Sequence, residues 1–403
     1  MSRPFVLYLI SRVLLTLVGA MLSVAVGWHI YEATGNPFDL ALVGLMQILP
    51  IVGLFIVSGW VVDHLQRKYV LVGCAVVQSV VFAGLAISFS NGEFDRVAVY
   101  GLLLLNGAAR AFYSPAVQSI LPSIVPEEEL SQAVAISSTC WTAAAAAGPF
   151  IAGLLIAWID TDIYQLLAIL SLVAGLAVFT LPAAIVRRPT GRGLAQLLDG
   201  IHYVYRNPYV LPSIFLDMVI VLVGSVVALL PVFAVDVLHV GPEALGLMSA
   251  MPALGAVAAG ALLTYLPTMR RTGLLLNASL AVFALSIIVF GLSASLWLSL
   301  AALFIYGASD MVSVNVRTTV IQLATPDELR GRVNSVNSLF IATSNDVGGF
   351  RAGAVATVLG PIGTVLLGGA MAVGVVIGGY FLFPKLRRLD RITDSGTPAT
   401  RDS

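Results

Sequence analysis

A small set of ionisable residues lies inside long apolar stretches of this sequence. Arg110, Asp310 and Asp346 fall near the middle of such stretches, and Asp217 and Arg351 are two further cases. A charge exposed to lipid costs at least about 2.5–3.5 kcal/mol on insertion scales, so these residues are expected to face a bundle interior or a wet cavity. An arginine there would recognise an anionic group. An aspartate balanced between desolvation and a nearby arginine would load and release a proton near neutral pH.

The same charges have a second interpretation, as fixed ion pairs that hold helices together. Arg12, Arg317 and Asp217 lie nearer the ends of their apolar stretches, where long side chains reach the membrane interface. For these three, a structural role is at least as expected as a transport role. For the charges near mid-stretch we favour a role in a cavity. Sequence spacing does not decide which arginine lies beside which aspartate.

The elements that position these charges are long apolar helices. Of the 403 residues, 59% are hydrophobic and 10% are charged, and the mean hydropathy is +0.97, whereas soluble domains carry roughly 25% charged residues. Stretches of about 20 apolar residues are long enough to cross a hydrocarbon core of about 30 Å. We therefore expect an all-α polytopic membrane protein with twelve transmembrane helices, over residues 7–31, 39–62, 69–90, 97–118, 133–157, 163–186, 211–235, 243–266, 273–292, 296–317, 334–358 and 361–383.

The basic residues predict the orientation of these helices. If the N-terminus is cytoplasmic, the lysines and arginines outside the apolar stretches gather in the cytoplasmic loops and ends, and the opposite loops hold only Arg96. The positive-inside rule then places both termini in the cytoplasm, in agreement with an even number of spans. The first apolar stretch is too long for a signal peptide, so we expect it to be retained.

The longest polar connection divides the expected helices into six and six. We predict an N-terminal bundle over residues 1–186, a cytoplasmic linker over 187–210, a C-terminal bundle over 211–383 and a cytoplasmic tail over 384–403. Apolar residues recur at helical spacing within the linker and stop at Pro208, which predicts an amphipathic helix in the cytoplasmic interface. These apolar residues are Leu194, Leu197, Leu198, Ile201, Val204 and Tyr205.

The two halves resemble each other. Residues 106–126, "NGAARAFYSPAVQSILPSIVP", align with residues 306–326, "YGASDMVSVNVRTTVIQLATP", which matches Gly107 to Gly307 and sets Arg110 against Asp310. A slightly larger shift aligns "SRVLLTLVGA" with "LDMVIVLVGS" and sets Arg12 against Asp217. Because each repeat has an even number of spans, both insert in the same orientation around an axis along the membrane normal. This geometry predicts two pseudo-symmetric six-helix bundles with a cavity between them.

A charged motif follows the second expected helix. Residues 59–68 read "GWVVDHLQRK", with Gly59, Asp63, Arg67 and Lys68 at its key positions. In a duplicated chain of twelve helices, this motif resembles the signature of the major facilitator superfamily. The resemblance implies that Gly59 allows close helix approach, and that Asp63, Arg67 and Lys68 form a cytoplasmic latch that is made in one conformation only. Such contacts contribute about 1–3 kcal/mol. An ordinary charged turn is the alternative.

Three other segments extend the resemblance over nearly the whole chain. "RTTVIQLATPDELRGRVNSVNSLF", "TSNDVGGFRAG" and "LDMVIVLVGSVVALLPVFAVDVL" are similar to the branch of bacterial siderophore exporters, the enterobactin exporter family among them, and of related multidrug efflux proteins. "AAAAAGPFIAG" partly resembles a glycine-proline motif of antiporters, with Gly148, Pro149 and Gly153 in place and Ala152 where a glycine is usual. Small residues there also allow tight helix packing in any membrane protein.

In this superfamily the first, fourth, seventh and tenth helices line the cavity. The resemblance implies that Arg110, Asp217 and Asp310 line it, and that Asp346 and Arg351 lie at its margin. We expect proton coupling at Asp310, Asp346 and Asp217. The expected cargo contacts are Arg110, Asn106, Tyr113, Asn315 and Arg351.

Other classes of function find little support in the sequence. A phosphate-binding loop needs a Gly-Lys-Ser/Thr ending, but Lys68 and Lys385 lie in other contexts. The four histidines are scattered without a metalloprotease pattern. Cys74 and Cys140 lie in different apolar stretches, so both are interpreted as packing residues and no metal site is expected. We predict no enzyme, no cofactor and no nucleic-acid partner.

These observations favour a secondary transporter of the bacterial inner membrane. We expect it to act as a monomer and to export a small amphipathic molecule, siderophore or drug-like, in exchange for protons. Uptake or facilitated diffusion of a metabolite or lipid-like substrate is an alternative. A sensor that resembles a transporter but carries no flux is another.

Overall fold

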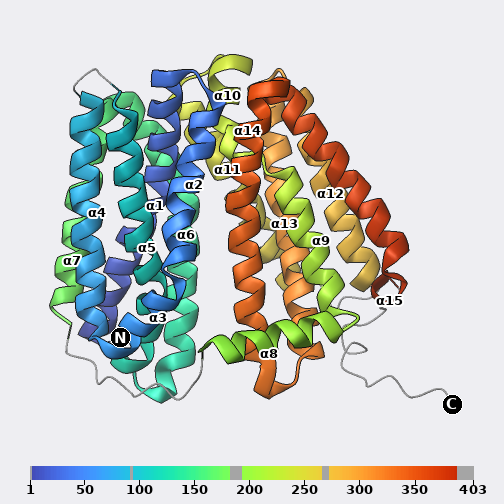
Figure 1. The fold of residues 1–403 in the computed structure, drawn as a ribbon, viewed down its shortest axis with the longest axis horizontal. Helices are drawn as coiled ribbons and strands as arrows, with labels where there is room; N and C mark the ends of the chain where they lie inside the picture. The colour runs from blue at the N-terminus through green and yellow to red at the C-terminus, as the bar shows by residue number, and fades with distance from the viewer. Residues whose placement is uncertain (1, 91–93, 182–192, 266–271, 388–403) are drawn as a thin grey trace. The chain divides into compact units, whose positions relative to one another are not determined.

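The computed structural model describes residues 2–90, 94–181, 193–265 and 272–387, which are almost entirely helical (Figure 1). No strand occurs among these residues, so the all-α prediction is confirmed. Within the described chain, eight helical stretches are long and apolar enough to cross a membrane. Two of them, Leu130–Phe179 and Leu329–Leu382, are 50 and 54 residues long and each covers two of the expected spans. The protein is therefore a multi-pass membrane protein, and the count of twelve crossings stays a prediction.

The chain divides into two compact units. Unit 1 comprises Met1–Thr190 and Leu230–Ala250, and unit 2 comprises Gly191–Leu229 and Met251–Ser403. The segment Leu230–Ala250, which the expected boundaries assign to the C-terminal bundle, groups with unit 1. The described part of the linker groups with unit 2. Residues 187–192 of the linker and 388–403 of the tail lie outside the described residues.

Unit 1 is built from helices whose ends follow capping rules. Gly35 ends α1 in the left-handed conformation, with φ of 58°. Asn36 then caps α2 by accepting a hydrogen bond from the amide of Phe38 at 3.0 Å, and Asp95 caps α5 in the same way. The elements are α1 (Arg3–Thr34), α2 (Pro37–Gly53), α3 (Phe55–His64), α4 (Arg67–Ser90), α5 (Arg96–Ile124), η1 (Glu127–Glu129), α6 (Leu130–Ile159), η2 (Asp160–Asp162), α7 (Ile163–Phe179), α10 (Leu230–Val232), η4 (Phe233–Val237) and the first turns of α11 (Pro242–Tyr265).

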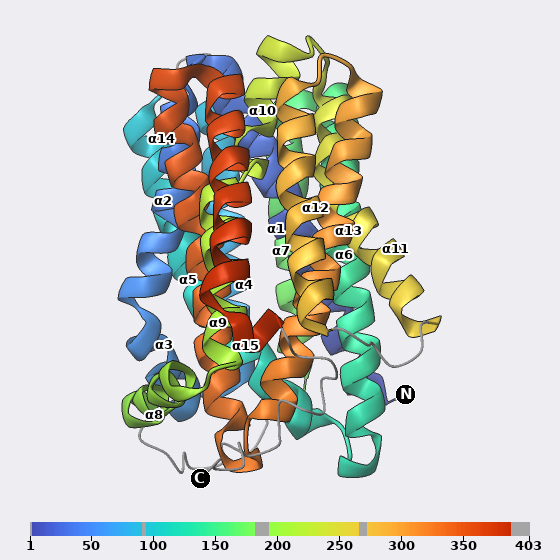
Figure 2. The same cartoon turned by 90° about the vertical axis from the view of Figure 1, so that its right-hand side faces the viewer.

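Unit 2 holds the remaining helices. These are α8 (Gly193–Arg206), α9 (Val210–Gly224), η3 (Val227–Leu229), the rest of α11, α12 (Thr272–Leu292), α13 (Leu296–Ala324), α14 (Asp327–Leu382) and α15 (Pro384–Arg387). Helix α14 is interrupted at Gly360, whose φ of 70° and ψ of 171° are not helical, directly before Pro361. Figures 1 and 2 show the chain turning back there between two long rods. The expected spans 334–358 and 361–383 correspond to these rods.

Two other expected spans are interrupted. The span 39–62 is split at Leu54, directly after Gly53, a residue type that weakens a helix interior. The span 211–235 is split after Gly224, where Ser225 and Val226 leave the helix. Both breaks lie within single units.

The predicted amphipathic helix of the linker is present as α8, but one face of it packs on protein. Val204 is buried in a cluster with residues of α13 and α14, and the Tyr203 hydroxyl donates a hydrogen bond to the Ala324 carbonyl. A Cβ on Gly200 would lie 2.8 Å from the carbonyl oxygen of Arg332. Figures 1 and 2 show α8 running across the ends of these helices. Tyr205, expected on the apolar face, is exposed.

The internal duplication is visible in the helices themselves. Helices α5 and α13 are both 29 residues long and begin at Arg96 and Leu296. A Cβ on Gly107 of α5 would meet the main chain of Gln47, and a Cβ on Gly307 of α13 would meet the main chain of Pro252. These glycines thus allow α5 to approach α2, and α13 to approach α11, in the same way within each unit.

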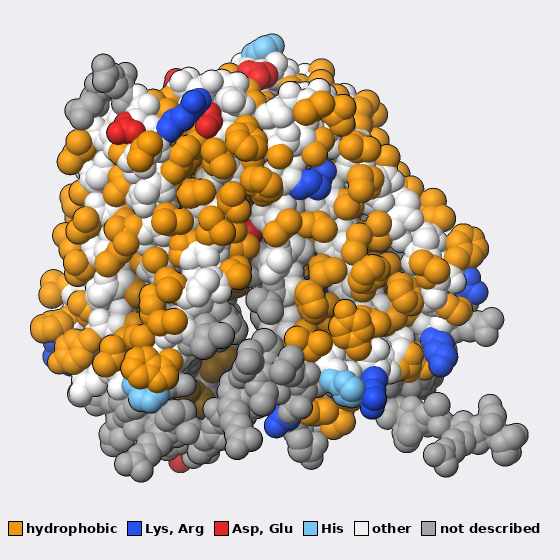
Figure 3. Space-filling model, in the orientation of Figure 1, with side chains coloured by type: hydrophobic (Ala, Val, Ile, Leu, Met, Phe, Trp, Pro, Cys, Tyr) orange, Lys and Arg blue, Asp and Glu red, His pale blue; other side chains and the backbone are white. Residues whose placement is uncertain are grey.

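The surface agrees with a membrane location. On the face shown in Figure 3, hydrophobic side chains cover the middle of both units, while charged side chains and histidines lie mainly towards the ends. Trp158 and Trp297, near the ends of α6 and α13, are 84% and 78% exposed, as expected for aromatic residues at a membrane interface.

Candidate functional site

Among the described side chains of unit 2, the most deeply buried charges form an ion pair. Asp217 of α9 pairs with Arg317 of α13, and their side chains are only 6% and 2% exposed. Ser313, one turn earlier on α13, donates its hydroxyl to Asp217 at 3.2 Å. Removing one partner of such a pair is strongly destabilising because the other charge stays buried. Asp217 is therefore engaged as half of an ion pair, the structural interpretation that the sequence left open.

Asp310, on the same helix, is in a contrasting situation. Its side chain is half-buried and makes no hydrogen bond or ion pair with any side chain that the structure describes. One turn earlier, the ring of Tyr306 packs on Phe283 of α12 with centroids 4.3 Å apart, which fixes this part of α13. An ionised carboxylate without a partner is costly in apolar surroundings. A protonated Asp310 would avoid this cost.

Asp346 and Asn315 complete the polar residues expected in this unit. Both are half-buried, Asp346 on α14 and Asn315 on α13. Gly348, two residues after Asp346, lies against α9, because a Cβ there would be 3.1 Å from the carbonyl oxygen of Leu222. This contact brings the turn of α14 that carries Asp346 and Gly348 against the C-terminal end of α9.

Arg351 is bound to that helix end. Its Nε donates to the Leu222 carbonyl at 3.0 Å and its Nη2 to the Val223 carbonyl at 2.7 Å. Because α9 ends at Gly224, these carbonyls belong to the last turn and lack the usual helical donors. A cation also interacts favourably with the negative end of a helix. Arg351, predicted as a cargo contact, caps the C-terminal end of α9 in this structure.

In unit 1, Arg110 finds a partner that its sequence neighbours do not provide. Its side chain is exposed, and Nη1 donates to Oε1 of Gln47 on α2 at 3.0 Å. One turn earlier on α5, Asn106 is 1% exposed, and its Oδ1 makes no hydrogen bond within the described chain. Gly107 allows the close contact between α5 and α2 that brings Gln47 to Arg110. Gln47 was not predicted.

A second arginine of unit 1 is surrounded by hydroxyl groups. Nη1 of Arg12 donates to the Tyr8 hydroxyl and to the Ser137 hydroxyl, at 2.8 Å in both cases. The Tyr8 hydroxyl in turn donates to the Val117 carbonyl at 3.3 Å. Tyr113, predicted as a cargo contact, packs against the apolar cluster that contains Tyr8 and Val117, and its hydroxyl oxygen is buried without a hydrogen-bond partner in the described structure.

The latch residues follow α3. Arg67 donates to the Ser119 carbonyl of α5 at 2.8 Å, and Lys68 donates to the Leu181 carbonyl at 3.2 Å. A Cβ on Gly59 would meet no described atom within 4 Å, so the close approach implied for this glycine is absent from the described structure. Asp63 is helical, but its side chain lies outside those described.

The antiporter-like motif makes the close packing that small residues permit. A Cβ on Gly148 would lie 2.5 Å from the Cβ of Ala20 on α1, and one on Gly153 would lie 2.7 Å from the Cα of Gly246 on α11. A Cβ on Gly246 would in turn lie 2.8 Å from the carbonyl oxygen of Pro149. In unit 1, these residues pack α6 directly against α1 and the start of α11.

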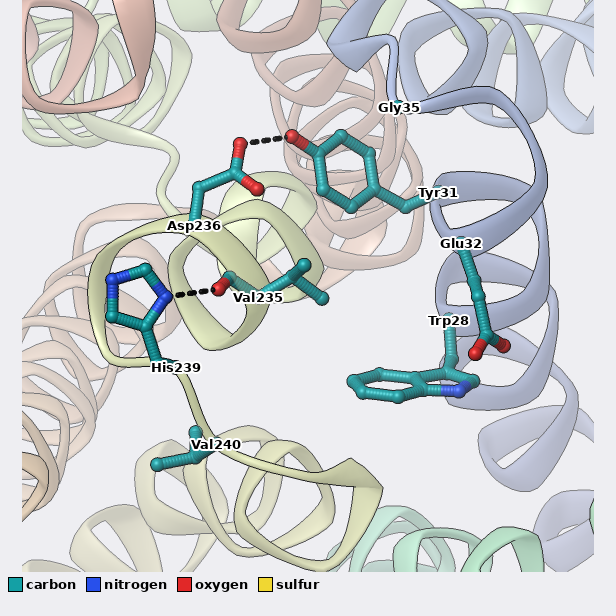
Figure 4. Close-up of a pocket in the computed structure, with 8 residues that line it drawn as sticks. All are labelled: Trp28, Tyr31, Glu32, Gly35, Val235, Asp236, His239 and Val240. Carbon is teal, nitrogen blue, oxygen red and sulfur yellow. Dashed lines mark hydrogen bonds between the residues drawn. The ribbon is translucent and has the colours of Figure 1, made fainter.

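A pocket of about 400 Å³ opens beside α1 and η4 (Figure 4). Tyr31 is buried and donates its hydroxyl to a carboxylate oxygen of Asp236. Figure 4 shows Trp28 and Glu32 on the α1 side of the pocket, across from His239. The remaining lining residues are Gly35, Val235 and Val240.

The other face of α1 is held by His29. Its two ring nitrogens lie 3.0 Å from the Tyr164 hydroxyl and 3.0 Å from Oδ1 of Asp160. His29 is 4% exposed, and its ring also packs near Phe89 of α4. The C-terminal end of α1 is therefore fixed on two faces.

The whole chain can now be compared with known proteins. Residues 4–400 match the family model of the transmembrane secretion effectors, within the major facilitator superfamily. The chain belongs to this family of transporters.

Curated relatives of the transporter are efflux proteins. It is 28% identical over 379 residues to enterobactin exporter EntS of Citrobacter koseri, covering 92% of this chain and 89% of that protein. It is 23% identical over 374 residues to macrolide efflux protein A of Streptococcus pyogenes, covering 90% of this chain and 91% of that protein. The predicted resemblance to siderophore and multidrug exporters is confirmed.

Solved structures support the fold of the transporter. The nucleoside transporter NupG aligns with a TM-score of 0.73 at 14% identity, over 96% of this chain and 100% of that one. A bacterial homologue of the iron transporter ferroportin aligns with a TM-score of 0.73 at 16% identity, over 96% and 100%. At these identities the likeness concerns the fold alone.

Proposed function

We propose that this transporter exports a small amphipathic molecule across the bacterial inner membrane in exchange for protons, by alternating access. The export direction is supported by the match of nearly the whole chain to efflux relatives. The observation that carries proton coupling is Asp310, a half-buried carboxylate on a membrane helix without a hydrogen bond or ion pair to the described side chains. We assign the coupling proton first to Asp310 and second to Asp346.

The contrast with Asp217 explains this order. A carboxylate that already has an arginine and a serine as partners is stabilised in its ionised form, so gaining a proton would break an ion pair. Asp310 loses no such pair when it is protonated. Proton loading at Asp310 therefore requires less rearrangement, and Asp217 ranks below it as a coupling site.

We assign cargo contacts to polar residues that keep hydrogen-bonding capacity. Asn106 has an acceptor without a partner, and Arg110 is exposed and bonded to one neutral amide. Tyr113 has a hydroxyl without a partner, and Asn315 is half-buried on the helix of Asp310. Their chemistry suits an amphipathic molecule with several polar groups. For Arg351, the two bonds to the end of α9 favour a structural role.

The conformational cycle would use contacts at both ends of unit 1. Asp63, Arg67 and Lys68 form the proposed cytoplasmic latch, and Tyr31 with Asp236 provides a contact near the opposite end of α1. We further propose that both termini are cytoplasmic and that a monomer is the functional unit. A terminal fluorescent fusion that folds only on the cytoplasmic side would test the orientation.

The coupling proposal is tested in proteoliposomes. Liposomes containing the full chain are acid-loaded with a pH-sensitive dye inside, and enterobactin or a macrolide is added outside. We expect cargo-dependent loss of internal protons with the wild-type protein and none with Asp310→Asn. Glu243→Gln, which neutralises an exposed carboxylate at the start of α11, is the matched control and should behave as wild type.

The alternatives give different results in the same experiment. Cargo movement without any pH change would indicate facilitated diffusion or another coupling ion. Binding of cargo without any flux would indicate a sensor. Unchanged proton movement in Asp310→Asn would contradict the assignment of the proton to this residue.

A further inference from the structure

Arg12 of the first repeat and Asp217 of the second occupy equivalent positions, but only Asp217 has an oppositely charged partner among the described side chains. The alignments that set Arg12 against Asp217 and Arg110 against Asp310 also set Val117 against Arg317. In unit 2, Asp217 forms an ion pair with Arg317. In unit 1, the position of Asp217 is held by the basic Arg12, and the position of Arg317 is held by Val117, which is buried and uncharged. The duplication thus leaves Arg12 without the counter-charge that its equivalent has.

The actual surroundings of Arg12 do not replace that counter-charge. Its printed hydrogen bonds go to two neutral hydroxyls, both from Nη1, and it pairs with no carboxylate whose side chain the structure describes. Helix α1 is long and apolar enough to span a membrane, so a net positive charge there is costly. Arg12 is half-buried and therefore still accessible. Its remaining donors have the fork geometry that binds a carboxylate with two bonds.

Tyr113 is a second residue of unit 1 whose hydrogen-bonding capacity is unused. Its hydroxyl oxygen is buried without a hydrogen-bond partner in the described structure. Its ring packs against the cluster that contains Tyr8, the residue whose hydroxyl accepts a hydrogen bond from Arg12. A buried hydroxyl that makes no hydrogen bond loses the free energy that water would have supplied. The residue at the equivalent position of unit 2 is Ser313, which donates to the carboxylate of Asp217. Both repeats therefore have a hydroxyl at this position. In unit 1, the Tyr113 hydroxyl can still donate a hydrogen bond to an acceptor.

We propose that Arg12 and Tyr113 form a recognition site for an anionic oxygen group of the cargo, such as a carboxylate or an aromatic acid. The bound anion would contact Arg12 and Tyr113 as the Asp217 carboxylate contacts Arg317 and Ser313 in unit 2. Tyr8 and Ser137 are positioning residues, because their hydroxyls hold Nη1 and orient the other donors. This inference rests on the proposed transport function and narrows it to cargo with an anionic group.

Binding to the purified full chain in detergent tests the site without requiring flux. The probes are radiolabelled 2,3-dihydroxybenzoate, an anionic aromatic molecule, and ethidium, a cationic one, in equilibrium dialysis. We expect Arg12→Gln to weaken binding of the anion at least tenfold and Tyr113→Phe to weaken it about three- to tenfold. Arg3→Gln removes an exposed arginine from the same helix and should leave binding unchanged.

A carboxylate installed in the protein itself gives the sharper test. Val117 aligns with Arg317, the ion-pair partner of Asp217. The glutamate of Val117→Glu should therefore pair with Arg12 and exclude the anion as effectively as Arg12→Gln does. The double variant Arg12→Gln, Val117→Glu should be no weaker than either single variant. In wild type, bound anion should also protect Arg12 from phenylglyoxal, detected by mass spectrometry. This last measurement requires no variant to fold.

The outcomes separate this site from the proposed function. Anion binding that is equal in wild type and Arg12→Gln, a wild type that binds only ethidium or neither probe, or absent protection of Arg12 would overturn the site. Anion binding that depends on Arg12 in a protein without proton-coupled flux would uphold the site and contradict the transport mechanism.

Discussion

Tyr31 of α1 donates a hydrogen bond to Asp236 of η4, although 205 residues separate them in the chain. The bond lies within unit 1, which contains Leu230–Ala250 as well as the N-terminal helices. Two close contacts accompany it. A Cβ on Gly27 would lie 3.1 Å from the Pro231 ring, and Gly153 lies against Gly246. A segment from the second half of the sequence is thus fastened to α1 and α6.

We predict that Tyr31→Phe weakens this attachment. A hydrogen bond to a charged group contributes about 1.5–3 kcal/mol, so a conformation that depends on it should lose about tenfold or more in population. The measurement is the labelling rate of Trp28→Cys by an impermeant maleimide, in a background without Cys74 and Cys140. Tyr100→Phe removes a similar hydrogen bond, from the Tyr100 hydroxyl to Oδ1 of Asp39 at 2.6 Å. This control variant should leave the labelling rate unchanged. Equal rates in Tyr31→Phe and its parent would contradict the prediction.

The buried pair in unit 2 predicts a large loss of stability on neutralising one member. Asp217→Asn leaves Arg317 charged and buried, at a cost of about 3–5 kcal/mol. Replacing both residues by apolar ones of similar size should recover most of this loss. The measurement is the midpoint of thermal unfolding in detergent for Asp217→Asn and for Asp217→Leu with Arg317→Met. A double variant less stable than the single one would show that the pair itself stabilises the fold.

The glycine contact between α6 and α11 predicts a position-specific effect of one methyl group. Gly153→Ala would bring a Cβ within 2.7 Å of the Cα of Gly246, so the backbones must separate, at a cost of about 1–3 kcal/mol. Gly44→Ala on α2 adds the same methyl group where no other described part of the chain comes within 4 Å, and it should be neutral or slightly stabilising. Unfolding midpoints of both variants decide this. Equal midpoints would refute the contact.

Arg351 predicts a separation of stability from cargo affinity. Arg351→Gln removes the cap on the Leu222 and Val223 carbonyls, so we expect a lower unfolding midpoint and a cargo Kd within about threefold of wild type. Each lost charge-assisted bond accounts for about 1.5–3 kcal/mol. Arg351→Lys should recover part of the stability. A large loss of affinity at unchanged stability would instead favour the cargo contact predicted from the sequence.

Much of the fold was predictable because its signals are local or periodic. Apolar stretches predicted the helices, and the repeat aligned α5 with α13, which share their length. The break at Leu54 inside span 39–62 and the break after Gly224 inside span 211–235 were not predicted, whereas the break at Gly360 falls between the expected spans 334–358 and 361–383. A hydropathy window averages over single residues such as Gly53 and Gly224, so it does not register a short break within an apolar stretch.

The site was less predictable because its pairings join distant helices. The ionisable residues Arg110, Asp217 and Asp310 were found from their apolar surroundings. The partner of Asp217, however, is 100 residues away, and Asp236 is 205 residues from Tyr31. Such contacts depend on which helix faces which neighbour, and one sequence carries no direct signal of that.

Helix α1 is one uninterrupted rod of 32 residues, with proline only at its start. Arg12 and Tyr31 lie on it about 29 Å apart, at 1.5 Å per residue. Whatever tilts the helix at the anion site also displaces the hydroxyl that holds Asp236. Thermodynamic linkage makes such an effect reciprocal, so an anion that loosens the distant bond must bind more tightly, by the same factor, once that bond is cut. We therefore expect this uninterrupted helix to couple occupancy of the proposed anion site at Arg12 to the hydrogen bond between Tyr31 and Asp236.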